Sequence, residues 1–131
     1  MKPPKEIPGS AKEWLSHAQS DLALAKLASG DQNILASQVC FHAQQSAEKA
    51  IKAVLRFHQI DFPFTHDLDA LLEVAGQSKI LIPPNVQDAG RLTPYAVEAR
   101  YPGAASPIEA DVQSSIQLAQ AILDWATPII K

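Results

Sequence analysis

Four side chains that can carry positive charge share one face of a long helical segment: His42, Lys49, Lys52 and Arg56. Their spacing of seven, three and four residues keeps them on one side of a helix. Ammonium and guanidinium groups hold phosphate through charge-assisted hydrogen bonds, so this face could bind an anionic ligand. The same spacing is typical of the solvated outer face of an amphipathic helix. Two interpretations therefore stay open, a phosphate-binding ridge and a solvent-facing surface.

Two more candidate residues lie further along the chain. His66 stands at an expected helix start, where its ring could act as a general base near neutral pH or fix the turn with Thr65 and Asp67. Arg100 could hold a phosphate or a carboxylate, and Glu48 is its candidate internal partner. The predicted nucleotide- or phosphate-binding residues are Lys49, Lys52, Arg56, Arg100 and His66.

Other chemistries lack a recognisable motif in the sequence. It contains no Ser-His-Asp or Cys-His order, no glycine-rich phosphate loop and no Cys/His spacing for a metal. We therefore predict no catalytic residue, no metal site and no cofactor. The single cysteine, Cys40, falls among apolar helix positions, which favours a buried structural thiol.

Length and composition favour one helical domain over residues 1–131. The chain is 47% hydrophobic but only 6% aromatic, and alanine and leucine suit helices better than sheets. A net charge of −3 gives no overall attraction to nucleic acid or anionic membrane, so any anion site must be a local patch. No apolar run approaches the ~20 residues of a membrane span, and the N-terminal residues do not resemble a signal peptide. These features predict a soluble cytoplasmic protein.

The segment 34–58 is predicted to be the central helix of the fold. It contains no glycine or proline, and its apolar stripe is mostly alanine, which lets neighbouring helices approach closely. Gln44 falls inside that stripe and Glu48 on its border. A buried polar group without a partner costs roughly 1–3 kcal/mol. We therefore expect Gln44 or Glu48 to be hydrogen-bonded inside the protein.

Residues 1–9 are expected to form an extended arm, followed by a helix over 11–29 that begins with a Ser10–Glu13 capping box. A short helix with Thr65 as its cap should then run from His66 to Gly76. A kinked helix over 84–99 contains Pro94, although Thr93-Pro94 could instead split that segment in two.

The last helix is predicted to begin at Pro107, with a Ser106–Glu109 capping box, and to be closed by Pro128. The predicted fold is an all-α antiparallel up-and-down bundle of four long helices plus a short helix. Four apolar side chains fall outside the core stripes and predict a homodimer: Leu24, Leu27, Leu118 and Trp125.

With these elements in place, the sequence resembles the HEPN domain family. The resemblance rests on the string from Cys40 to Leu55, on Thr65-His-Asp-Leu68, on Tyr95 and on Arg100-Tyr101-Pro102. It implies a helical bundle that is often dimeric and is frequently encoded with, or fused to, a small nucleotidyltransferase. The function that we predict is a binding and interaction module, the partner subunit of such a nucleotidyltransferase, with a nucleotide or phosphate contact.

Some members of the family that the chain resembles are toxins that cut RNA. They carry an arginine, then four to six residues, then a histidine. Arg56 is followed at the required positions by Asp-Phe-Pro, and Arg100 by Ala-Ser-Pro, so neither arginine has its histidine. The alternative function is a HEPN ribonuclease of a toxin–antitoxin pair, which would have to use His66 or His42 instead.

Overall fold

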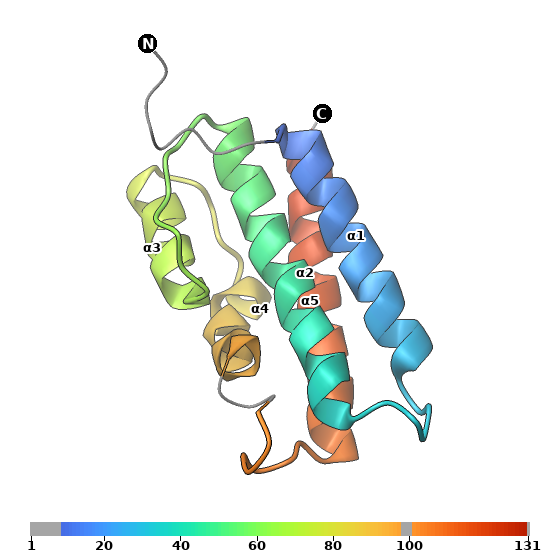
Figure 1. Ribbon diagram of the computed structural model, residues 1–131. Coiled ribbons are helices and arrows are strands. Elements are labelled where there is room, and N and C mark those ends of the chain that lie inside the picture. The colour runs from blue at the N-terminus through green and yellow to red at the C-terminus, as the bar shows by residue number, and fades with distance from the viewer. Residues whose placement is uncertain (1–8, 98–100, 131) are drawn as a thin grey trace.

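The computed structural model describes residues 9–97 and 101–130, and every regular element in these two ranges is a helix. The long elements are α1 (Ala11–Ala28), α2 (Ala36–Phe57) and α5 (Glu109–Ile129) (Figure 1). The shorter ones are α3 (Leu68–Gln77), α4 (Pro84–Gln87) and the 3₁₀ helix η1 (Asp88–Ala96). The predicted all-α up-and-down bundle is confirmed.

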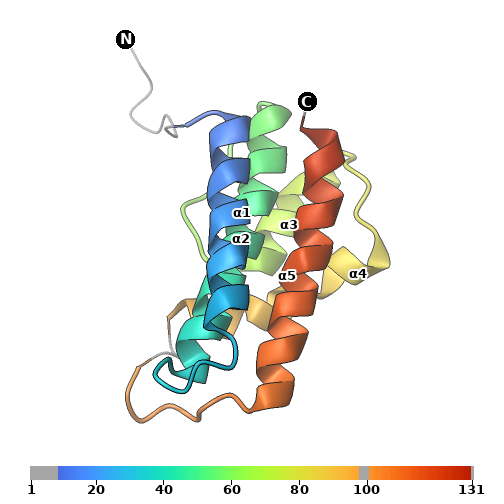
Figure 2. The ribbon, with the colours of Figure 1, turned by 90° about the vertical axis from the view of Figure 1, so that its right-hand side faces the viewer.

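Helix α2 is the centre of the fold, as its alanine-rich pattern predicted. It packs against α1, α5, α3 and η1, and Figure 2 shows α1, α2 and α5 running side by side with α3 behind them. Ala43, Ala47 and Ala50 are fully buried on α2. Small side chains at these positions allow close approach from several directions, so more than one side of α2 is covered.

The first helix begins as the sequence predicted. The Ser10 hydroxyl accepts a hydrogen bond from the Glu13 backbone N–H at 3.1 Å, and the Glu13 carboxylate accepts one from the Ser10 N–H at 2.9 Å. This reciprocal pair satisfies two donors that a helix start otherwise leaves free. The chain turns after α1 at Gly30, whose φ of +85° favours glycine.

The predicted start of the last helix is wrong by two residues. Helix α5 begins at Glu109, with Ile108 as its N-cap residue and Asp111 in its first turn. The Ile108 N–H donates to the Asp111 carboxylate at 2.9 Å. Because Asp111 satisfies this donor, the Ser106–Glu109 box is not needed to start the helix. Pro128 lies inside the last turn of α5 and does not close it.

The middle of the chain also differs in detail from the prediction. Asp67, not Thr65, caps α3, and its carboxylate accepts from the Asp69 and Ala70 N–H groups at 3.1 and 3.3 Å. The segment expected to be one kinked helix is α4 followed by η1, with Pro94 inside η1. Proline removes one backbone donor and disfavours regular α-helix before it, which is consistent with the tighter 3₁₀ winding. The end predicted at residue 99 lies outside the described residues.

Of the four apolar side chains that prompted the homodimer prediction, Leu24 and Leu27 are exposed, at 45% and 81%. Leu118 and Trp125 pack partly buried against the core, and the Trp125 indole N–H donates to the Leu81 carbonyl at 3.1 Å. No helix in the described part of the chain is both long and apolar enough to cross a bilayer.

Candidate functional site

A buried carboxylate on α2 collects donors from three side chains. Glu48 Oε1 accepts from Gln44 Nε2 at 3.0 Å and lies 2.8 Å from His66 Nδ1, while Oε2 accepts from Lys52 Nζ at 2.9 Å. Gln44 also accepts from Gln45 Nε2 at 2.7 Å. We call Glu48, Gln44, Lys52 and His66 the Glu48 network. It confirms that the polar residues in the apolar sector of α2 are hydrogen-bonded inside the protein.

The electrostatics of the Glu48 network favour the ionised carboxylate. Burial raises the pKa of Glu48, but hydrogen bonds from Gln44, Lys52 and His66 together outweigh burial, so the pKa lies below its ordinary value of 4.5. The Lys52 ammonium also lies 5.8 Å from the ring centre of Trp14 and 5.6 Å from that of Phe62. Two aromatic rings and one carboxylate thus offset the cost of burying the charge of Lys52, which is almost fully buried.

The imidazole of His66 has one nitrogen directed to Glu48 and the rest of its ring largely in solvent. Its side chain is 55% exposed, whereas that of Glu48 is 6% exposed. A carboxylate at Nδ1 fixes the orientation of the ring, and no described residue is hydrogen-bonded to Nε2 of this largely exposed side chain. The backbone N–H of Asp67 bonds to the Thr65 hydroxyl at 3.0 Å, so the turn around His66 is also fixed locally.

A second ion cluster joins α1 and α2 on another side of the central helix. Lys49 Nζ lies 2.7 Å from Asp21 Oδ2, and His42 Nδ1 lies 3.3 Å from Asp21 Oδ1. Both contacts are partly exposed, with the Lys49 side chain 24% accessible. Lys49 is therefore neutralised by α1 but still reachable from solvent.

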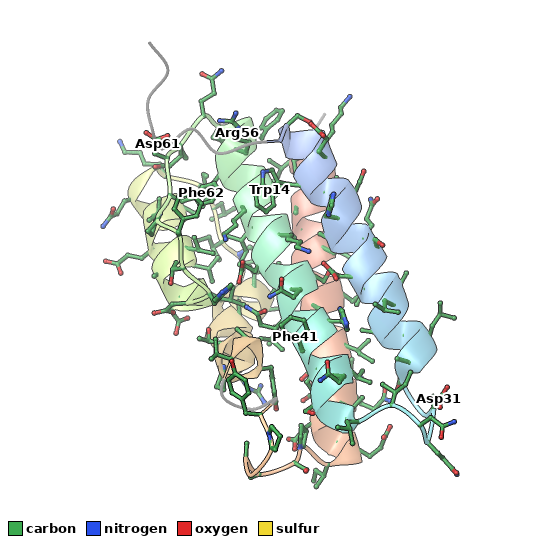
Figure 3. The ribbon with its side chains drawn as sticks, viewed as in Figure 1. Trp14, Asp31, Phe41, Arg56, Asp61 and Phe62 are labelled. Atoms are coloured by element: carbon green, nitrogen blue, oxygen red, sulfur yellow. The ribbon has the colours of Figure 1, made fainter. Side chains whose placement is uncertain are left out.

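Arg56 lies near the end of α2, where it contacts the start of α1. Its Nε donates to the Gly9 carbonyl at 3.1 Å. Figure 3 shows Arg56, Phe62 and Trp14 at the same end of the bundle, where α1 begins and α2 ends. Arg100, the remaining predicted cation, lies outside the described residues.

A cavity of about 390 Å³ opens between α1 and α2 next to Trp14. We call it the Trp14 cavity, and the described residues lining it are Gly9, Glu13, Trp14, His17 and Lys49. The Trp14 indole N–H is buried and has no hydrogen-bond acceptor among the described residues. A buried donor left without an acceptor costs about 1–3 kcal/mol.

The family model for the HEPN domain matches residues 11–129. The chain belongs to the HEPN domain family. This identification confirms the resemblance carried by the α2 string and by the Thr-His-Asp-Leu turn. No curated protein matches the sequence significantly.

Two solved structures share the fold of this HEPN domain over nearly its whole length. ST0689, described as an archaeal HEPN homologue, is 28% identical with a TM-score of 0.78, covering 95% of this chain and 100% of that chain. TT1696 from Thermus thermophilus is 25% identical with a TM-score of 0.73, covering 91% of this chain and 97% of that one.

Four of the residues predicted to bind phosphate lie in the described part of this HEPN domain, and each has a partner there. Lys52 and His66 share Glu48, Lys49 pairs with Asp21 on α1, and Arg56 contacts Gly9. The four residues therefore have three different sets of partners. Their role in ligand binding remains a prediction.

Sequence reasoning missed two residues that shape this region, Asp21 and Trp14. Asp21 was not connected with Lys49 because the pair spans two helices whose relative rotation no local pattern specifies. Trp14 was not among the candidate residues. A tryptophan at the polar border of a helix was the available signal, because its indole N–H requires an acceptor when it is buried.

Proposed function

We propose that this HEPN domain is a binding and interaction module rather than a ribonuclease. The observation that carries this proposal is the Glu48 network, in which a buried carboxylate engages both Lys52 and His66. The missing histidine after Arg56 and Arg100 adds independent support. The buried ionisable groups of α2, Glu48 and Lys52, thus compensate each other inside the fold.

The ligand contact that we propose is a nucleotide or phosphate held by the partly exposed cations Lys49 and Arg56 in the C-terminal half of α2. Lys49 is accessible at the Trp14 cavity, and Nε is the atom of the Arg56 guanidinium that has a hydrogen-bond acceptor, the Gly9 carbonyl, among the described residues. Guanidinium and ammonium groups with donors to spare are suited to phosphate oxygens. Arg100 and His66 complete the proposed set if the loop before α5 reaches this region.

Nucleotide titration of the purified protein tests this contact. Lys49→Ala/Arg56→Ala should weaken nucleotide binding by about tenfold or more and leave the helical content unchanged. Lys26→Ala/Arg91→Ala removes the same charge from distant positions and should bind like the wild type. Absence of nucleotide binding to the intact protein at millimolar concentration would overturn the contact.

The partner that we propose is a small nucleotidyltransferase, an expectation from the HEPN family rather than from any contact in this chain. Co-expression with a nucleotidyltransferase encoded beside this gene tests it. A complex that survives size-exclusion chromatography is expected. Separate elution of the two proteins at micromolar concentration would contradict the pairing.

We also propose a homodimer, since Leu24 and Leu27 leave an apolar surface on the outside of α1. Analytical ultracentrifugation should show a dimer for the wild type and a shift toward monomer for Leu24→Ser/Leu27→Ser. A clean wild-type monomer at micromolar concentration would refute the homodimer.

The alternative function, RNA cleavage, is favoured by one observation. Glu48 orients the ring of the largely exposed His66, an arrangement that suits a general base. We expect no RNA cleavage by the purified domain. Robust RNA cleavage that disappears in His66→Ala would show that the protein is a ribonuclease and would overturn the binding-module proposal.

A further inference from the structure

The Trp14 cavity combines an aromatic ring, a cation and an unused donor in one place. Trp14 contributes its indole to the wall of the cavity, and its N–H lacks an acceptor in the part of the chain that the structure describes. Gly9 closes over that N–H, since a side-chain Cβ at Gly9 would lie 3.4 Å from Nε1.

The remaining walls contribute charges of both signs. Lys49 comes from α2, while Glu13 and His17 come from α1. Hydrogen bonds from the Ser10 backbone and hydroxyl lower the pKa of Glu13, so its carboxylate is ionised at neutral pH. The cavity thus offers a flat ring, an anion that accepts hydrogen bonds, and one ammonium beside an imidazole. These are complementary to a planar heterocycle carrying hydroxyl or amino groups and one phosphate.

We propose that the Trp14 cavity binds a nucleoside monophosphate, with the base against Trp14 and the phosphate at Lys49 and His17. Glu13 accepts from the sugar hydroxyls or from the amino group of the base. This proposal rests on the proposed nucleotide contact and assigns that contact a place and a ligand class. Neither Trp14 nor His17 was among the residues expected to bind the ligand.

Size and charge both favour a monophosphate. Ligand cavities are typically about 300–1,000 Å³, so a volume of about 390 Å³ suits a small ligand. Lys49 already balances Asp21, and Glu13 adds a negative charge, so the site could not compensate a triphosphate. A second cavity, near Arg91 and Asp111, measures about 100 Å³ and is too small for a base with its sugar phosphate.

Tryptophan fluorescence reports directly on the proposed base position. The chain has two tryptophans, so Trp125→Phe leaves Trp14 as the only source of tryptophan emission. Adenosine 5′-monophosphate should quench this emission with saturation. Adenosine should bind at least about tenfold more weakly, because it lacks the phosphate. Inorganic phosphate, which cannot stack, should leave the emission unchanged.

Calorimetric titration of variants with the same nucleotide then tests the residues. Trp14→Phe keeps an aromatic ring but removes the N–H, and it should weaken binding about fivefold to tenfold. His17→Gln should weaken binding about threefold. His58→Gln makes the same change at a residue that follows α2 and is not part of the cavity wall, so it is the matched control and should bind like the wild type. Circular dichroism checks that each variant is folded.

Two outcomes distinguish a failure of the Trp14 cavity as the binding site from a failure of the proposed nucleotide binding itself. If the nucleotide binds but Trp14 emission does not change and Trp14→Phe binds normally, the nucleotide contact stands and the Trp14 cavity is not its site. If the intact protein binds no nucleotide at millimolar concentration, both proposals are wrong.

Discussion

Two sides of α2 use similar residue types in opposite ways. In the Glu48 network each of the four side chains has a hydrogen-bond partner, and Lys52 and Glu48 are almost completely buried. At the Trp14 cavity, Lys49 remains accessible and the Trp14 N–H has no acceptor among the described residues. Satisfied buried groups stabilise the fold, whereas accessible groups with unused capacity can bind a ligand. The neighbours that cover each side of α2 decide which role a lysine takes.

The largest expected effect comes from breaking the Glu48 network. Glu48→Ala removes the acceptor shared by Gln44, Lys52 and His66 and leaves a buried ammonium uncompensated. We expect the free energy of unfolding to fall by about 3–5 kcal/mol in urea denaturation. Glu73→Ala removes an exposed carboxylate and should change stability by less than about 0.5 kcal/mol. Equal effects of the two substitutions on the free energy of unfolding would show that the Glu48 network does not stabilise the fold.

Low pH should remove part of the stabilisation that Glu48 gives to the folded protein. Because the pKa of Glu48 is lower in the folded protein than its ordinary value of 4.5, its stabilisation is complete above that pH and is lost as the pH falls through the folded pKa. The stability difference between the wild type and Glu48→Gln should therefore shrink below pH 4.5. Urea denaturation from pH 7 downward measures it. A difference that stays constant with pH would contradict the ionised, hydrogen-bonded carboxylate.

A smaller effect is expected on the cavity side. Asp21→Asn removes the negative charge that neutralises Lys49 across a partly exposed contact. Such pairs contribute about 0–1 kcal/mol, so stability should change little. The affinity for adenosine 5′-monophosphate should rise about threefold, because the Lys49 ammonium is freed for the phosphate. Asp124→Asn, which removes the same charge from an exposed position on α5, should leave the affinity unchanged.

Features that depend on local sequence were predictable. The Ser10–Glu13 capping box forms within one turn, and the alanine-rich stripe of α2 specifies a central helix wherever its neighbours lie. The start of α5 was misplaced because two carboxylates, Glu109 and Asp111, could each complete a cap. Local patterns identify an element more reliably than its first residue.

Features that depend on how helices rotate against one another were not predictable. The sequence placed Lys52 on the polar face of α2, yet Lys52 is buried between Trp14 and Phe62. It did not connect Glu48 with His66 and Lys52, which bond to its carboxylate. Pairs such as Lys49 and Asp21 are separated by 28 residues, and no periodicity connects them.

The most direct test of nucleotide binding at the Trp14 cavity is a nuclear magnetic resonance titration of the ¹⁵N-labelled protein with adenosine 5′-monophosphate. A binding module that uses the cavity side of α2 predicts the largest shifts at the Trp14 indole N–H and at the backbone of Glu13, His17 and Lys49, with smaller shifts at His66. Shifts concentrated at His66 and α3, or none at millimolar nucleotide, would contradict it.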